Sequence, residues 1–311
     1  MGRGPWVPFC KFKKHFCETI KSAPPNASMI RFGLIGCGRF GKHYSSNIGR
    51  GDFGSVEVVC TRNVRPAELL RTGAEWCSDY RDVCDNPSID CVIVATPPSS
   101  HFAICRAALS AGKHVICEKP FVHEVSEAEE LRDLADKQGL SLVVNYIHLW
   151  NSEITKLFKA FDFSSNLPHF IDFQASCLGP LRKEYSMLWD WYCHDLALLL
   201  TYVGLPSGEL VSSNYLFEGA ENAGILTSRC RIGAVKAHSF VSNLCGIKRK
   251  GISITGPVGT LSFEDNFSGE ALMAMLQDFS SHWNRGKRLT NAQLAVDITR
   301  LVSRCLPCTM S

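Results

Sequence analysis

Three groups of residues in this 311-residue chain have types and spacings that could do chemistry. The first is Gly36-Cys37-Gly38-Arg39-Phe40-Gly41, a Gly-x-Gly-x-x-Gly pattern between a short apolar run and a plausible helix. In such a loop the first glycine allows a sharp turn, the second lets backbone approach a pyrophosphate, and the third lets helix and strand pack closely. Free N–H groups and the positive end of the helix dipole then receive the phosphates. The pattern therefore predicts a dinucleotide site, although three glycines in six residues also occur in ordinary turns.

The second group is Glu118-Lys119-Pro120, which follows a predicted strand over 113–117. Pro120 favours extended backbone at Lys119 and so directs a long cationic side chain beyond the end of the strand. An ammonium there can hydrogen-bond a substrate hydroxyl and stabilise the alkoxide that develops as a hydride leaves. A solvated surface lysine is the alternative.

The third group is Asp190 and His194, four residues apart, whose side chains can meet on one face of a helix. A carboxylate would fix the tautomer of the imidazole and raise its basicity, which would make His194 a proton-transfer group near neutral pH. The alternative is that Asp190 caps the helix while His194 is a hydrogen-bonded core residue. Asp195 adjoins His194 in sequence, faces away from it, and is the weaker candidate partner.

Strands and helices alternate around the first two groups. The apolar and amphipathic patterns predict strands over 30–35, 56–61, 89–95, 113–117 and 140–145, and helices over 39–48, 65–72, 79–84, 99–111 and 126–138. Ser126 and Glu129 form a capping-box pattern at the start of the last helix, and Gly139 is expected to end it. Alternation of this kind predicts right-handed crossovers and a parallel, doubly wound sheet.

In such a sheet, ligands bind outside the carboxyl ends of the strands. Thr61, Arg62 and Asn63 follow the second strand about 20 residues after the glycine loop, where an acidic residue would hold the ribose of NAD. Arg62 could instead bind a 2′-phosphate, which favours NADP, or it could be a solvated arginine. Thr96 and Pro97 follow the third strand and could run beneath a nicotinamide ribose, with His101 expected to cap or pack beside them.

A different pattern follows residue 146. A helix is predicted over 151–161 and strands over 169–177, 210–217, 223–229, 234–240, 251–255 and 260–263, with helices over 196–203, 271–282 and 291–304. Sequential strands with short turns predict a largely antiparallel sheet in an α+β domain. We therefore divide the chain into a tail over 1–28, a dinucleotide-binding domain over 29–146 and a second domain over 147–311.

Composition excludes several classes of function. The chain is 45% hydrophobic and 20% charged with a net charge of +3, and it has no apolar run long enough to span a membrane. Residues 1–28 hold five Lys and Arg against one Glu, so the remainder carries −1 and nucleic acid is not expected as a partner. We expect that tail to be disordered; a tether to an anionic surface is the open alternative. Fifteen cysteines without a signal peptide favour a reduced, cytoplasmic setting, and no metal site is predicted.

Taken in order, these motifs resemble the Gfo/Idh/MocA family, named after glucose–fructose oxidoreductase and inositol dehydrogenase. The resemblance runs from Met29 to the end of the chain and rests on the glycine loop, Ala95-Thr96-Pro97 with His101, Gly112–Val115 leading into Glu118-Lys119-Pro120, and Asp190-x-x-x-His194. It implies a Rossmann domain followed by an open, mainly antiparallel sheet, with NAD or NADP and usually a sugar or polyol substrate. The catalytic lysine, aspartate and histidine of the family correspond to Lys119, Asp190 and His194.

Two departures from the family pattern concern the site. Tyr192 and Cys193 stand where small residues or proline are common, and Arg62 stands where NAD-preferring relatives carry an acid. The hypothesis is an NAD(P)-dependent oxidoreductase in which His194 takes the hydroxyl proton, Asp190 orients His194 and Lys119 holds the oxygen. The alternative is an NADP-sensing regulatory protein without chemistry. An open sheet edge and face favour a homodimer or homotetramer.

The candidate residues fall into two further sets. The predicted cofactor-binding residues are Gly36, Cys37, Gly38, Arg39, Phe40, Gly41, Thr61, Arg62, Asn63, Thr96, Pro97, His101, Glu118, Lys119 and Pro120. The predicted contacts to a sugar-like substrate, chosen by position alone, are Tyr146, His148, Arg182 and Tyr185.

Overall fold

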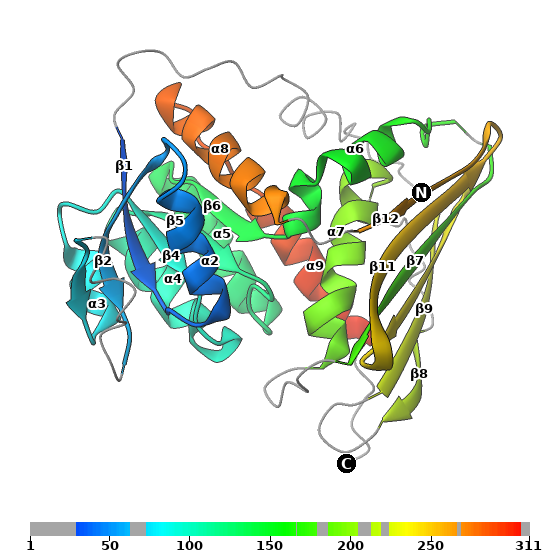
Figure 1. Cartoon of the computed structure of the whole chain (residues 1–311), viewed down its shortest axis with the longest axis horizontal. Coiled ribbons are helices and arrows are strands. Elements are labelled where there is room, and N and C mark those ends of the chain that lie inside the picture. Colours follow the sequence, from blue (N-terminus) through cyan, green and yellow to red (C-terminus); the bar gives the residue numbers. More distant parts are fainter. Residues whose placement is uncertain are drawn as a thin grey trace, which may run out of the picture.

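The chain folds into two lobes, each built on a six-stranded sheet (Figure 1). The computed structural model describes residues 29–62, 73–165, 167–178, 186–204, 213–218, 224–265 and 269–305. The predicted tail over 1–28, the predicted helix over 65–72, and Asn63, Arg182 and Tyr185 lie outside the described residues.

The first lobe is the predicted doubly wound domain. Its sheet has the order β3-β2-β1-β4-β5-β6 and every described pair of strands is parallel. The strands are β1 (Ile30–Ile35), β2 (Gly54–Cys60), β3 (Glu75–Cys77), β4 (Cys91–Val94), β5 (His114–Glu118) and β6 (Leu142–Asn145). The helices are α2 (Arg39–Ile48), α3 (Tyr80–Asp85), α4 (His101–Ser110) and α5 (Val125–Gln138), with a short 3-10 turn over Pro98–Ser100. The strand order reverses between β1 and β4, which is where such sheets bind ligands.

Two local predictions in this lobe have different outcomes. Gly139 ends α5 in the left-handed conformation with φ 67°, as expected. The capping box is wrong, because α5 begins at Val125 with Glu124 at the N-cap position, which places Ser126 inside the first turn. The three-residue strand β3 was not predicted, since a segment this short shows no alternation of apolar and polar residues.

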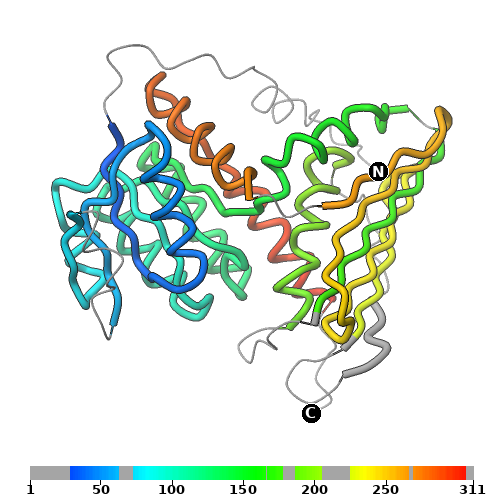
Figure 2. Tube along the Cα trace, viewed as in Figure 1, coloured from blue at the N-terminus to red at the C-terminus, as the bar shows by residue number. Residues whose placement is uncertain are grey.

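The second lobe contains the predicted open sheet, in the order β12-β11-β7-β10-β9-β8. Its strands are β7 (His169–Leu178), β8 (Ser213–Glu218), β9 (Gly224–Ile232), β10 (Val235–Ser242), β11 (Leu244–Gly256) and β12 (Gly259–Glu264). All pairs are antiparallel except β7 with β10, so the sheet is mixed. Figure 2 shows β7 running between β10 and β11 although it precedes both in sequence.

One face of this sheet is buried and packs toward the first lobe. Its buried residues include Ile171, Phe173, Ile252 and Ile254, and the helices α6 (Ser152–Lys159) and α7 (Cys193–Tyr202) lie on that side (Figure 1). Asn151 begins α6 by accepting hydrogen bonds from the backbone N–H groups of the first turn. The far side of the sheet carries no described helix in Figure 1.

The last two helices return to the first lobe and hold the lobes together. Helix α8 (Glu270–Asn284) lies against α2 and against η3 (Ile147–Trp150), while α9 (Ala292–Cys305) packs on α5 and α7. Asn291 donates to the Val144 carbonyl at 2.9 Å and accepts from the Val144 N–H at 2.7 Å. Arg300 reaches Glu129 on α5 at 2.7 Å. These contacts fix the edge of the first sheet against the second lobe, and the domain boundary at residue 146 stays a prediction.

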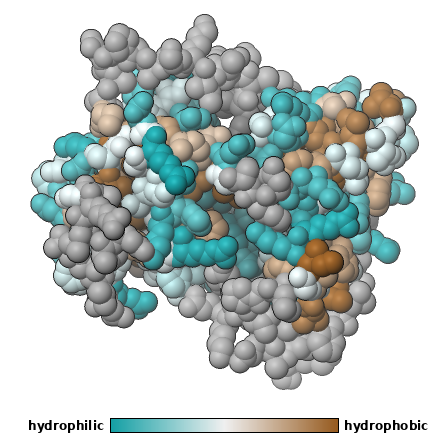
Figure 3. All heavy atoms as spheres, viewed as in Figure 1, coloured by the Kyte–Doolittle hydropathy of each residue, from teal (hydrophilic) through white to brown (hydrophobic). Residues whose placement is uncertain are grey.

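The surface is polar over most of the face in Figure 3, with hydrophobic residues gathered over the second sheet. Exposed apolar side chains of that sheet and its turns include Phe170, Ile247 and Val258. Within the described ranges, no helix has the length and apolar character needed to cross a membrane.

Candidate functional site

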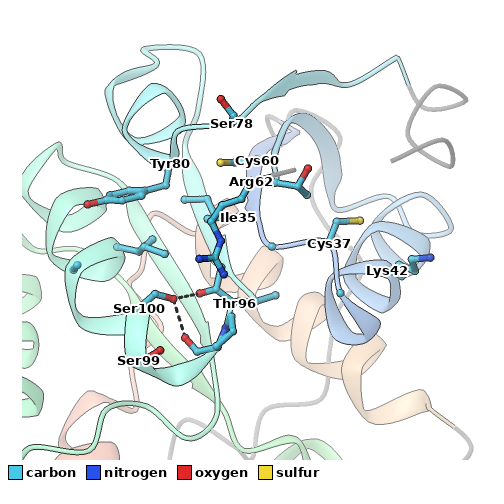
Figure 4. Close-up of a pocket in the computed structure, with 17 residues that line it drawn as sticks. Ile35, Cys37, Lys42, Cys60, Arg62, Ser78, Tyr80, Thr96, Ser99 and Ser100 are labelled. Carbon is cyan, nitrogen blue, oxygen red and sulfur yellow. Dashed lines mark hydrogen bonds between the residues drawn. The ribbon is translucent and has the colours of Figure 1, made fainter. Parts of the chain in front are cut away.

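A cleft of about 800 Å³ opens at the carboxyl ends of β1, β2 and β4 (Figure 4). It is bordered by the glycine loop after β1, the residues after β2 and β3, and the loop after β4 that leads into α4. Its lining residues are Ile35, Gly36, Cys37, Gly38, Lys42, Cys60, Thr61, Arg62, Ser78, Tyr80, Ala95, Thr96, Pro97, Ser99, Ser100, Ala103 and Ile104.

The glycine loop has the geometry that a dinucleotide phosphate requires. Gly36 has φ +94°, and a Cβ there would come within 2.5 Å of the Ala95 carbonyl oxygen. A Cβ on Gly41 would collide with the backbone of Gly36, so α2 can pack against β1 only with glycine at this position. A Cβ on Gly38 would meet nothing within 4 Å. Helix α2 begins immediately afterwards, and the N–H groups of its first turn lack intrahelical acceptors. The loop therefore fits a diphosphate.

The lining of the cleft also includes two cationic side chains. Lys42 and Arg62 are exposed lining residues, and none of the described lining residues is a carboxylate. Figure 4 shows the Arg62 side chain extending into the cleft. Trp76 on β3 donates from Nε1 to Thr61 Oγ1 at 2.9 Å and thereby holds the side chain next to Arg62. This arrangement can receive a further phosphate near the end of β2.

The loop after β4 is tied to the segment that carries Lys119. The Ser100 hydroxyl lies 2.8 Å from both Thr96 Oγ1 and the Pro97 carbonyl. His101 is completely buried, with Nδ1 2.9 Å from the carbonyls of Pro120 and Phe121 and Nε2 2.8 Å from that of Thr96. Burial lowers the pKa of His101, and the three carbonyls oppose this shift. His101 thus packs, as its sequence position suggested, and links two loops instead of lining the cleft.

Glu118 is also buried in the protein. Its Oε1 accepts hydrogen bonds from the Tyr44 hydroxyl at 2.8 Å and from Asn145 Nδ2 at 2.7 Å. Burial raises the pKa of Glu118, while its two donors and the adjacent Lys119 act in the opposite direction. The carboxylate therefore joins β5, α2 and β6 beneath the site, and it is not among the residues that line the cleft.

The predicted cofactor-binding residues are divided by the structure. Those that line the cleft are Gly36, Cys37, Gly38, Thr61, Arg62, Thr96 and Pro97. Those outside the lining are Arg39, Phe40, Gly41, His101, Glu118, Lys119 and Pro120. Sequence reasoning missed Lys42, Ser78 and Tyr80. Lys42 stands one helical turn after Gly38 and could have been found by that spacing; Ser78 and Tyr80 follow β3, which gave no signal.

Lys119 joins the two lobes by an ion pair. Its Nζ donates to Asp190 Oδ1 at 2.5 Å and to the Asp190 carbonyl at 2.6 Å. The side chains are 11% and 19% exposed. Lys119 stands at the carboxyl end of β5 in the first lobe, directly before a cis peptide bond to Pro120, whereas Asp190 belongs to η4 (Leu188–Tyr192) in the second. The ammonium is therefore fixed between the lobes.

The predicted contact between Asp190 and His194 is absent. Residues Leu188–Tyr192 form a π-helical turn before α7, which changes the four-residue spacing that would place the two side chains on one face. Asp190 bonds to Lys119, and the buried His194 Nδ1 has no hydrogen-bond partner among the described residues. The alternative in which His194 is a satisfied core histidine is therefore not supported either.

His194 lies against the residues predicted to contact substrate from η3. Its ring centroid is 4.6 Å from that of His148 and 6.4 Å from that of Tyr146. The pKa of His194 lies well below its ordinary value. Burial is the largest cause, and electrostatic repulsion from His148, Lys119 and Lys250 adds to it. Burial and the two lysines likewise lower the pKa of His148. Both imidazoles are therefore neutral near pH 7.

Other possible centres are not found in the described part of the chain. No group of three or more His, Cys, Asp and Glu side chains there could hold a metal ion, and no disulfide joins the cysteines described. Burial raises the pKa of the Cys193 thiol, next to His194, to about 12, so this thiol stays protonated.

Comparisons with known proteins agree with the cleft. Residues 30–146 match a model described as an oxidoreductase family with an NAD-binding Rossmann fold. The uncharacterized oxidoreductase YdgJ of Escherichia coli is 30% identical over 209 residues, which cover 62% of this chain and 59% of YdgJ. The scyllo-inositol 2-dehydrogenase (NADP⁺) IolW of Bacillus subtilis is 28% identical over 172 residues, covering 55% of this chain and 48% of IolW. The match thus spans about half to three fifths of these curated relatives.

A solved structure extends the likeness to the second lobe. A Magnetospirillum magnetotacticum protein assigned as an oxidoreductase superposes with a TM-score of 0.79 and 26% identity, covering 90% of this chain and 100% of that protein. The likeness therefore covers both lobes: the Rossmann sheet, the mixed sheet and the C-terminal helices that join them.

Proposed function

This chain belongs to the Gfo/Idh/MocA family of oxidoreductases, and we propose that it is an NAD(P)-dependent dehydrogenase acting on a sugar, polyol or related alcohol. One observation carries the proposal. A lysine from the end of β5 is bonded across the lobes to the π-helical turn that leads into His194, and its ammonium is close enough to lower the pKa of that imidazole. Lys119 precedes Pro120, which His101 ties to the Thr96 loop at the border of the cleft.

Each residue has a role that follows from its surroundings. When bound, the nicotinamide would accept or return the hydride. Lys119 donates a hydrogen bond to the substrate oxygen and stabilises the negative charge that develops on it. Asp190 holds the Lys119 ammonium, a different role from the predicted orientation of His194. His194 takes the hydroxyl proton during oxidation, for which a neutral imidazole is required. Tyr146 and His148 enclose the imidazole.

For the cofactor we propose NADP(H) in preference to NAD(H). Arg62 and Lys42 bring two cations to the cleft, and no described lining residue is an acid that would hold the 2′-hydroxyl of NAD. A 2′-phosphate near the end of β2 would form a charge-assisted hydrogen bond with the Arg62 guanidinium. IolW, which acts with NADP⁺ according to its name, is a similar protein, and this agrees with the proposal.

The test combines binding with turnover. Calorimetric titration of the purified chain with NADPH and with NADH measures the cofactor preference directly. A panel of keto-sugars and oxidised inositols is then added to the NADPH complex while cofactor fluorescence is followed. We expect the fluorescence to decay with at least one member. Tight NADPH binding without decay across the panel would favour the alternative, a regulatory protein that senses NADP without chemistry.

Two broader proposals concern the setting of the enzyme. The second sheet leaves a face without a described helix, and we propose that it supports a homodimer or homotetramer; light scattering at micromolar concentration would measure the mass. Cysteines buried as small apolar side chains, such as Cys91 and Cys117, support a reducing, cytoplasmic setting. A tagged chain outside the cytoplasm would contradict it.

A further inference from the structure

A second ion pair holds the turn of α7 that carries His194. Lys250 on β11 places its Nζ 2.8 Å from Asp195 Oδ1 on α7, and each side chain is only 1% exposed. Among the ion pairs of the described residues, no other has both side chains this deeply buried. The pair joins the inner face of the second sheet to the first turn of the helix that carries His194.

Stability does not explain this pair. Removing two charges from water costs several kcal/mol per ion before their attraction is counted, and apolar replacements of similar volume are often neutral or stabilising. Ile252 and Ile254 occupy the same inner face of β11 and are fully buried, so apolar side chains suit this layer. Lys250 lies on the same face of β11 as these isoleucines, so its burial needs an explanation other than packing.

The positive charge of Lys250 affects the protonation of two imidazoles, those of His148 and His194. Asp195 is the residue after His194, so the ion pair anchors the same turn of α7 that carries the imidazole. The positive charge of Lys250 contributes to the lowered pKa of both His148 and His194. Asp195 Oδ2, like His194 Nδ1, is buried without a hydrogen-bond partner in the described part of the chain.

We propose that Lys250 and Asp195 are positioning residues for His194, anchoring the first turn of α7 to β11 and holding a positive charge near the imidazole. This inference rests on the proposed function, in which His194 must stay neutral to accept the substrate proton. The groups that act on the His194 ring or contact it are Lys119, Tyr146, His148 and Lys250; Asp190 and Asp195 are the partners of the two lysines, and Cys193 is the preceding residue. Lys119 is likewise bonded to Asp190, so both lysines that lower the pKa of His194 have an aspartate partner.

The test removes both charges together, because loss of one partner alone would leave a buried charge. In the double variant Lys250→Met/Asp195→Asn, the histidine ring signals are titrated by NMR in the absence of cofactor. We expect the pKa of His194 to rise by about one unit or more relative to the wild type, since a nearby positive charge disfavours the protonated ring. Lys250→Arg keeps the charge and is expected to leave the titration of His194 unchanged.

A matched control removes a pair that lies far from the site. Arg31→Met/Asp90→Asn breaks a bidentate pair at the amino ends of the parallel strands β1 and β4, the ends away from the cleft. This variant should not move the His194 titration. If the first double variant does not fold, Lys250→Gln/Asp195→Asn keeps a hydrogen bond between the two side chains while removing both charges. A folded double variant in which His194 titrates as in the wild type would overturn the inference.

Kinetics separate this inference from the proposed function. For alcohol oxidation, the acid limb of kcat/KM is expected to move to higher pH in the double variant, with the KM for cofactor unchanged. A uniform loss of kcat at every pH would indicate a structural effect alone and would overturn the positioning role. A wild-type protein without turnover, but with the NMR shift on charge removal, would refute the dehydrogenase proposal and still support the electrostatic coupling.

Discussion

The cleft over the first sheet and the centre around His194 both contain positively charged side chains, but they differ in exposure and in ion pairing. In the cleft over the first sheet, Lys42 and Arg62 are exposed and no described lining residue is a carboxylate. The interlobe centre consists of Lys119, part-buried between the lobes, and Lys250, buried within the second lobe, each bonded to an aspartate of the second lobe. The cleft thus places its cations in a lining without a described carboxylate, whereas each lysine of the interlobe centre has an aspartate as its partner. In the proposed function, the first arrangement favours a phosphorylated cofactor and the second supports a proton transfer.

The largest effect should come from the interlobe centre. Replacing Lys119 by Met removes the donor to the substrate oxygen, and we expect kcat to fall about 10²- to 10³-fold. The affinity for NADPH should stay near the wild-type value, because Lys119 is outside the lining of the cleft. Steady-state kinetics and calorimetric titration measure the two quantities.

A second variant controls for the charge left behind. Lys119→Met leaves Asp190 partly buried without the lysine that it bonds, so stability falls with activity. In Lys119→Met/Asp190→Asn the charge of Asp190 is also removed. The unfolding temperature should then return toward the wild-type value, while turnover stays low. Recovery of turnover in the double variant would show that Lys119 only compensates Asp190, and the contrast between the two regions would disappear.

The cleft should respond in affinity, not in turnover. Arg62→Gln removes the cation expected to meet the 2′-phosphate, and NADPH should bind about ten- to a hundredfold more weakly. The affinity for NADH should hardly change, since NADH has no phosphate at that position. Lys42→Gln is the matched control: located one turn into α2, beside the glycine loop, it should weaken both cofactors similarly. Equal losses for both cofactors in Arg62→Gln would refute the NADP preference.

The parts of this contrast that could be predicted from sequence are those set by local chemistry. The glycine loop, the continuous apolar strand at β4 and the end of α5 at Gly139 depend on residues close in sequence. The structure confirms the parallel sheet and the helices expected around it within the described residues, which do not include the predicted helix over 65–72. Arg62 and Lys119 were likewise found from the rule that ligands meet the ends of strands.

The remaining features depend on contacts between distant segments. Asp190 bonds to Lys119 because a π-helical turn changes the register before α7, and no residue pattern marks such a turn. Lys250 is one lysine in a basic stretch of β11, and only the fold shows that its side chain points inward while Arg249 pairs with Glu264 at the surface. The parallel pairing of β7 with β10 could not be predicted from the sequence either, because it joins two segments that are far apart in the chain.

The smallest expected effect lies at the rim of the cleft and tests how far its selectivity depends on preorganised side chains. Trp76 on β3 donates a hydrogen bond to Thr61 Oγ1, next to Arg62. Trp76→Phe removes that donor and leaves an aromatic ring, and a hydrogen bond of this kind is worth about 0.5–1.5 kcal/mol. Calorimetry should therefore show NADPH binding weakened about two- to tenfold, with kcat unchanged. A loss as large as that of Arg62→Gln would mean that Trp76 contacts the cofactor itself, so that selection in the cleft would depend on stacking as much as on charge.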